Sequence, residues 1–185
     1  MKEPNWEKCT EEELWRYVAT HLAKNGIDTI LVGGAVVAVY TEGAYRSGDL
    51  DFVLLSYLNE KLPRLMAEIG FKVERSRHYS HPRCKHLIID FASGPPGIGD
   101  DQKIKPQEVK SEGSVIKLYS PTDCIRDRLA SYIHFKALEC LDQAVLVARK
   151  HPFDRAKVKK WCAGEGAPGA FRDLEERLNR EGPDR

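Results

Sequence analysis

The chain has 185 residues, of which 42% are hydrophobic and 31% charged, so it can bury the core of one compact domain. Its 29 Lys and Arg residues nearly balance its 28 Asp and Glu residues, which excludes a polycation that coats nucleic acid but not a local basic patch. The longest apolar run, Ile30–Tyr40, is too short to span a membrane, and the N-terminus lacks a signal-peptide stretch, so we expect a cytoplasmic protein without membrane association.

The first half of the chain predicts a mixture of helices and strands. Thr10 and Glu13 have the spacing of a capping box, which predicts a helix over residues 11–25. The apolar segment 29–32 predicts a strand, and the small apolar residues 35–40 predict a buried helix. Further strands are predicted at 49–55, 71–75, 85–91 and 115–119, and a further helix at 60–69.

The second half is predominantly helical. Residues 93–113 predict a loop, because they contain Gly-Pro-Pro-Gly and few apolar side chains. Ser120 and Pro121 then have the pattern of an N-cap and a first helical residue. Helices are predicted at 121–149 with a break near 135–137, at 152–161, and from 170 onward. We therefore predict an α+β fold, with a mixed sheet flanked by helices over residues 1–119 and a helical region over 120–185.

Two aspartates begin the predicted strand at 49–55. Residues two apart in a strand point to the same face, so Asp49 and Asp51 project side by side while Leu50 faces the core. Neighbouring carboxylates raise each other's pKa unless a cation lies between them, and paired oxygen ligands suit Mg²⁺. Asp90 interrupts a later apolar strand and is the best candidate for a third acid. The alternatives are solvated acids at a strand end and, for Asp90, a structural ion pair.

Two glycines separate the first predicted strand from the helix that follows. Gly33 and Gly34 let the backbone approach a ligand, and the helix N-terminus behind them offers free N–H groups and a positive dipole end. This arrangement suits the triphosphate of an NTP. Arg46 and Ser47, just before the acids, are further candidates for phosphate contacts, with a surface loop as the alternative for both.

These motifs resemble the nucleotidyltransferase superfamily, whose fold is that of DNA polymerase beta. The matching residues are Gly33, Gly34, Asp49, Asp51 and, by order and strand character alone, Asp90, within about residues 28–95. The resemblance implies Mg²⁺-dependent transfer of a nucleotide from an NTP to an acceptor hydroxyl, with release of pyrophosphate. It also implies that Asp49 and Asp51 bind metal, and that Asp90 completes the metal site and helps to activate the acceptor.

The chain also has the motif Arg-Ser-x-Asp-hydrophobic-Asp, followed by a helical C-terminus. In these features it is similar to the toxin nucleotidyltransferases of toxin–antitoxin and abortive-infection systems. That likeness implies an acceptor on RNA (such as tRNA), protein or a small molecule, and a cognate antitoxin as partner. It also implies a C-terminal helix that closes over the nucleotide and brings Arg126 or Lys136 to phosphate, although surface pairs on a helix would look the same. The fourteen-residue spacer before Asp49 is slightly long for the superfamily, and Gly34 stands where many members have serine.

Two other function classes compete with this interpretation. A catalytically inactive nucleotidyltransferase fold could serve as a binding module or as one component of a toxin–antitoxin pair. A Rossmann-type ligand binder fits less well, because a third glycine at dinucleotide spacing is missing and the aspartate pair has no role there.

The five cysteines are scattered, and no two have CxxC spacing. We therefore expect reduced, mostly buried thiols, and neither a disulfide framework nor a four-ligand zinc site. His78, His81 and Cys84 are three residues apart and could be metal ligands, but no second Cys or His pair accompanies them. The surrounding stretch, 72–86, is rich in cations and is either a phosphate-facing patch or a solvated hairpin.

Overall fold

The computed structural model describes residues 2–55, 60–92 and 94–180 and shows an α+β protein. Its helices are α1 (Glu11–Lys24), α2 (Gly33–Tyr40), α3 (Leu62–Glu68), α4 (Pro121–Phe135), α5 (Leu138–Lys150), α6 (Arg155–Gly164) and α7 (Pro168–Arg180). Its strands are β1 (Thr29–Val32), β2 (Asp49–Leu54), β3 (Lys72–Arg75), β4 (His78–His81), β5 (Cys84–Ala92), β6 (Gln107–Ser111) and β7 (Ser114–Leu118). No helix within the described ranges has both the length and the apolar character needed to cross a bilayer.

The strands form one mixed sheet in the order β3-β4-β5-β2-β1-β7-β6. β2 lies in the middle of it, antiparallel to β1 and parallel to β5, and β1 runs parallel to β7. The register places Val32 at the end of β1 opposite Asp51 of β2, and Asp51 opposite Asp90 of β5. Three segments that are distant in the chain therefore meet near the start of β2.

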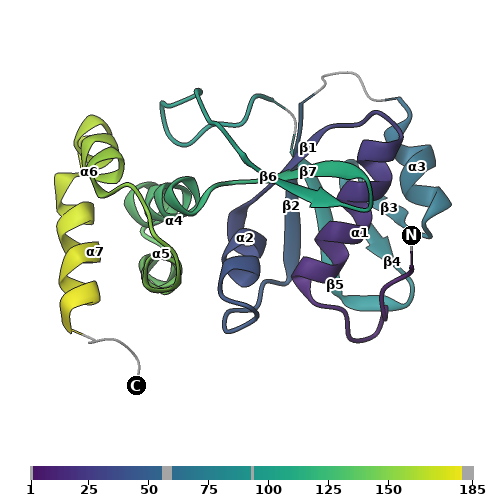
Figure 1. Ribbon diagram of the computed structural model, residues 1–185, viewed down its shortest axis with the longest axis horizontal. Coiled ribbons are helices and arrows are strands. Elements are labelled where there is room, and N and C mark those ends of the chain that lie inside the picture. The colour runs from purple at the N-terminus through teal and green to yellow at the C-terminus, as the bar shows by residue number, and fades with distance from the viewer. Residues whose placement is uncertain (1, 56–59, 93, 181–185) are drawn as a thin grey trace.

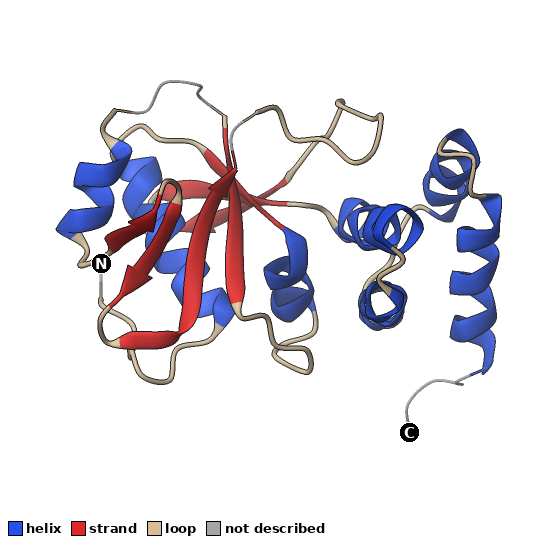
Figure 2. Ribbon diagram, turned by 180° about the vertical axis from the view of Figure 1, so that it is seen from behind, coloured by secondary structure: helices blue, strands red, loops and turns tan. Residues whose placement is uncertain are grey.

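The molecule has two parts (Figure 1). The sheet with α1 and α3 lies at one end, and α4–α7 lie at the other, as the view from behind also shows (Figure 2). α2 lies between them, because it packs on β1 and β2 as well as on α4 and α5. On α1, Leu14, Val18 and Leu22 recur every four residues and are fully buried, so one side of that helix contributes to the core.

Local signals in the sequence explain several helix boundaries. The predicted capping box is present at α1: the Thr10 hydroxyl accepts from the Glu13 backbone N–H at 3.2 Å, and the Glu13 carboxylate accepts from the Thr10 N–H at 2.8 Å. The predicted break after residue 135 is also present, because Lys136 adopts a left-handed backbone with φ of 55° and ends α4. α2 begins at Gly33, two residues earlier than predicted.

Two strands lie where the sequence predicted none. β4 (His78–His81) was missed, and the prediction of a loop over 93–113 was wrong for β6 (Gln107–Ser111). β6 lies at the edge of the sheet and pairs with β7, and no residue of β6 is fully buried. Such a strand needs no alternation of apolar residues, so periodicity could not reveal it.

Candidate active site

Gly33 lies against one of the predicted acids. Its φ is 73°, a left-handed conformation that favours glycine, and a Cβ added there would lie 2.4 Å from Oδ2 of Asp51. Only a glycine therefore leaves room for that carboxylate beside the start of α2. The β1–α2–β2 unit thus brings the diglycine and the first acidic strand together, as the sequence predicted.

The three predicted acids share one region of the sheet. Asp51 and Asp90 are register partners on parallel strands, and Asp49 lies two residues before Asp51, on the same face of β2. Leu50 and Phe52 point the other way and are fully buried, which anchors the strand. Among the described residues, however, these three carboxylates do not all come within 4.8 Å of one another. Their side chains must rotate for all three to share a single ion.

The charges at this site are unbalanced. Burial, then the neighbouring Asp49 and Asp90, raise the pKa of Asp51 to about 6. Oδ1 of Asp90 is buried and accepts no hydrogen bond within the described part of the chain. The ring Nδ1 of His78 lies 3.6 Å from this oxygen, and Nε of the Arg77 guanidinium lies 3.8 Å from it. Neighbouring carboxylate groups, one of which has an oxygen that accepts no hydrogen bond, are a donor set that fits a hard divalent cation such as Mg²⁺.

The loop before β2 is held by a residue that the sequence did not single out. Glu11, at the start of α1, is buried, and its Oε1 accepts from the Ser47 backbone N–H at 2.7 Å and from Arg46 Nε at 3.0 Å. The Ser47 hydroxyl donates to Oδ1 of Asp49 at 3.0 Å. Glu11 therefore positions the residues that orient Asp49, although in the sequence it was one of three first-turn acids.

These contacts bear on the two predicted phosphate ligands. The hydroxyl of Ser47 has a protein partner, and so has Nε of Arg46, but the Arg46 side chain is still 54% exposed. A role for either residue in binding phosphate therefore stays a prediction.

Tyr45, which lies beside Gly34, is linked by hydrogen bonds to the helices α4 and α5. A Cβ at Gly34 would lie 2.9 Å from Oγ of Ser47 and 3.4 Å from the Tyr45 hydroxyl. Nε2 of Gln143, on α5, donates to that hydroxyl at 3.2 Å, and NH1 of Arg128, on α4, donates to Oε1 of Gln143 at 3.3 Å. α4 and α5 are thus connected to the start of α2.

Arg128 is a cation of α4 whose charge acts on Asp51. It pairs with Asp127 at 2.6 Å, and its charge lowers the pKa of Asp51, against the larger effects of burial and of the other carboxylates. The sequence analysis named Arg126 or Lys136 as candidates for contacts with the nucleotide, with surface pairs on a helix as the alternative. Arg128 was not distinguished, because alternating charges on a helix also arise as surface pairs.

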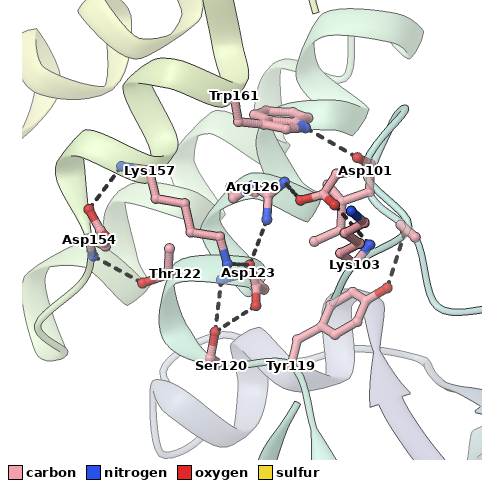
Figure 3. A network of polar contacts seen from close by, with 12 residues as sticks. Asp101, Lys103, Tyr119, Ser120, Thr122, Asp123, Arg126, Asp154, Lys157 and Trp161 are labelled. Carbon is pink, nitrogen blue, oxygen red and sulfur yellow. Dashed lines mark hydrogen bonds and ion pairs between the residues drawn. The ribbon is translucent and has the colours of Figure 1, made fainter. Parts of the chain in front are cut away.

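Arg126 is engaged elsewhere, in a buried polar network (Figure 3). Its NH2 donates to Asp101 at 2.5 Å, its NH1 donates to Asp123 at 2.8 Å, and its guanidinium lies 5.4 Å from the centre of the Trp161 ring. Lys157 of α6 donates to the same Asp123 at 2.8 Å. Arg126 therefore joins the segment after β5 to α4 and α6, and its NH1 and NH2 already have protein partners.

Solved structures share this fold. An antigenic nucleotidyltransferase-like protein from Paracoccidioides brasiliensis aligns with a TM-score of 0.54 and 17% identity over 74% of each chain. The antibiotic-resistance factor ANT(2'')-Ia aligns in its solution structure with a TM-score of 0.53 and 13% identity, over 88% of this chain and 91% of that one. Its crystal structure with adenylyl-2''-tobramycin aligns with a TM-score of 0.50 and 12% identity, over 90% and 96%. The chain therefore has the nucleotidyltransferase fold, as the sequence predicted.

Sequence comparisons add no closer relationship. A scan of protein-family models finds no match to this chain, and a search of curated proteins finds none either. Any activity must therefore be argued from the residues of the site.

Proposed function

We propose that the protein is a metal-dependent nucleotidyltransferase that moves a nucleotide from an NTP to an acceptor hydroxyl and releases pyrophosphate. The observation that carries this proposal is the register of β2 and β5, with Asp51 opposite Asp90, Asp49 on the same face and Gly33 directly against Asp51. A shared fold alone would not support an activity, because one fold can serve many functions. The placement of these four residues is the independent support.

Asp49, Asp51 and Asp90 would hold Mg²⁺, and their oxygen donors suit it. Bound Mg²⁺ neutralises phosphate charge and stabilises the attacking and leaving oxygens of an in-line displacement. The protein's own part is to keep Asp51 ionised at neutral pH, despite its raised pKa, and to leave Oδ1 of Asp90 without a hydrogen bond from the described residues. Asp90 is also our candidate for accepting the proton of the acceptor hydroxyl.

The start of α2 would bind the triphosphate. No side chain among the described residues caps this helix, so the N–H groups of its first turn, beginning at Gly33 and Gly34, are available to an anion. Arg46 can add a charge-assisted hydrogen bond through its exposed guanidinium, and Ser47 can do so if its hydroxyl turns from Asp49. Binding here would place the phosphates beside the carboxylates that hold the metal.

We further propose that residues 1–119 carry the chemistry and that the helical region 120–185 encloses the nucleotide through Arg128. The acceptor is a hydroxyl on RNA, on protein or on a small molecule. ANT(2'')-Ia was crystallised with adenylyl-2''-tobramycin, so an aminoglycoside belongs among the acceptors to test. We also propose that the protein acts in the cytoplasm, where it takes up Mg²⁺ and NTP, and that a cognate antitoxin is its protein partner.

The test is a transfer assay with labelled NTPs, Mg²⁺ and three acceptors: tRNA, a protein encoded by a neighbouring gene, and an aminoglycoside. We expect label on one acceptor, and we expect EDTA and Asp51→Asn to abolish the transfer. Asp28→Asn is the matched control, because Asp28 is an exposed acid paired with Lys117 on the surface. If no acceptor is labelled and the protein shows no Mg²⁺-dependent nucleotide binding, the proposal is wrong.

A further inference from the structure

A second group of ligand-type side chains lies at the other end of β5. Sγ of Cys9 is 3.7 Å from Sγ of Cys84, which in turn is 3.9 Å from Nδ1 of His86. All three donor atoms lie within 4.8 Å of one another, and no other such group of three occurs among the described Cys, His, Asp and Glu residues. Cys84 precedes Asp90 by six residues, which is about 20 Å along an extended strand, so this group is separate from the aspartates.

The spacing matches a tetrahedral ion with sulfur and nitrogen ligands. Zinc–sulfur bonds of about 2.3 Å at a tetrahedral angle place two sulfurs about 3.8 Å apart, and a zinc–nitrogen bond of about 2.0 Å places sulfur and nitrogen about 3.5 Å apart. The observed 3.7 Å between sulfurs agrees with the first value, and the observed 3.9 Å to Nδ1 needs only a small movement of the ring.

The second ring nitrogen of His86 is already engaged. Nε2 lies 2.9 Å from the carbonyl oxygen of Cys9, and since a carbonyl only accepts, Nε2 carries the hydrogen and donates it. In the neutral ring this leaves Nδ1 as the nitrogen with a free lone pair, and it lies 3.9 Å from Sγ of Cys84. A histidine that donates one N–H to a carbonyl while its other nitrogen meets the ion is the usual arrangement at metal sites.

We propose that Cys9, Cys84 and His86 form a binding site for a thiophilic divalent cation, with Zn²⁺ as the first candidate. Both cysteines are buried, and His86 borders a surface hollow of about 540 Å³, from which a water molecule can take the fourth position. On binding, each thiol passes its proton to solvent as its metal–sulfur bond forms, and no electron is transferred.

Such an ion would fix the N-terminal segment to the sheet. Just before Cys9, the Trp6 ring stacks on His81 of β4, with centroids 3.8 Å apart. Two residues after Cys9, Glu11 accepts the hydrogen bonds from Arg46 and Ser47. The ion would therefore stabilise the segment that carries Glu11, and its role would be structural.

The test uses the full chain, reduced with a phosphine, dialysed against a chelator and titrated with Co²⁺ under anaerobic conditions. We expect one equivalent to bind, with a sulfur-to-cobalt charge-transfer band and the visible bands of a tetrahedral ion, and Zn²⁺ to displace it. Cys84→Ala and His86→Gln should each weaken binding by about 100-fold or more. Cys140→Ala removes another buried thiol and His134→Gln another exposed histidine, and both should leave the titration unchanged.

The result is independent of the nucleotidyltransferase proposal. Asp51→Asn should bind Co²⁺ with the same spectrum, and excess Mg²⁺ should not displace the ion, because Mg²⁺ has little preference for sulfur. Absence of the charge-transfer band overturns the proposal. So does unchanged affinity in folded His86→Gln, or a Cys9–Cys84 disulfide in protein isolated without a reductant and free of metal.

Discussion

The two ends of β5 present different chemistry to an ion. At one end, Asp90 joins Asp49 and Asp51 to give a group of hard oxygen donors; at the other, Cys84 joins Cys9 and His86 to give sulfur and nitrogen donors. Burial raises the pKa of both kinds of acid, that of Asp51 to about 6 and that of Cys9 to about 12. At neutral pH the aspartate is therefore mostly charged, whereas the thiol keeps its proton until an ion displaces it. On our two proposals, β5 would contribute to two ions that do not compete, because oxygen donors and sulfur donors prefer different metals.

The largest expected effect is on nucleotide transfer, which should depend on the aspartates at one end of β5 and not on Cys84 at the other. Asp51→Asn removes an oxygen donor and should lower nucleotide transfer by about 1,000-fold or more, because metal positioning and charge neutralisation supply most of the catalysis in this reaction class. Cys84→Ala should leave the transfer rate within a few-fold of the wild type. Initial rates with labelled NTP measure both. Comparable losses in the two variants would show that the groups do not act separately.

The next effect concerns the absence of a side chain at Gly33, which leaves space for the Asp51 carboxylate. Gly33→Ala should lower the free energy of unfolding by about 2–4 kcal/mol and abolish Mg²⁺-dependent nucleotide binding, because it combines a left-handed backbone with a clash against the carboxylate. Gly43→Ala is the matched control, since Gly43 has a φ of 81° but nothing within 4 Å of an added Cβ. It should cost only the backbone strain, about 1 kcal/mol. Urea unfolding measures the free energy of unfolding of both variants. Equal losses in Gly33→Ala and Gly43→Ala would contradict the close approach of Gly33 to Asp51.

The raised pKa of Asp51 predicts a pH-dependent stability. A carboxyl group whose pKa is higher in the folded state contributes its full stability below its unfolded pKa of about 4, and loses that contribution as the pH rises through about 6. Without metal, Asp51→Asn should therefore be more stable than the wild type by about 1–2 kcal/mol near pH 8, allowing for solvent screening, and nearly equal to it near pH 4. Urea unfolding in EDTA measures this, and a difference that does not change with pH would contradict it.

The smallest expected effect on activity tests how the loop before β2 is held. Glu11→Gln weakens the charge-assisted hydrogen bonds to Arg46 and Ser47, and should cost about 1–2 kcal/mol of stability and a few-fold in KM for the NTP. Glu12→Gln is the control, because Glu12 makes an exposed i,i+4 pair with Arg16 that is worth only a few tenths of a kcal/mol. If the two variants have equal KM values, Glu11 does not position the site.

The same two ends of β5 also show what the sequence could predict. Asp49 and Asp51 are two residues apart on a strand, and Gly33 and Gly34 follow the strand before it, so local spacing alone predicted their common location. Asp90 was placed only by its strand character, and the parallel pairing of β2 and β5 then set it opposite Asp51.

Other contacts could not be predicted because they depend on tertiary packing. Cys9 and Cys84 are 75 residues apart, and the spacing of His78, His81 and Cys84 suggested a different set of ligands. The burial of Glu11 and the position of Arg128 near the acids depend on how α1 and α4 pack, which charge patterns on single helices do not reveal. The predicted helix from residue 170 onward includes residues 181–185, which lie outside the described part of the chain.

Calorimetric titration with a non-hydrolysable NTP, with and without Mg²⁺, tests the oxygen-donor end of β5 most directly. We predict binding that requires Mg²⁺, is lost in Asp51→Asn and persists in Cys84→Ala. Failure of the wild type to bind the nucleotide in the presence of Mg²⁺, or equal binding by folded Asp51→Asn, would contradict the assignment of Asp49, Asp51 and Asp90 as the metal and nucleotide site.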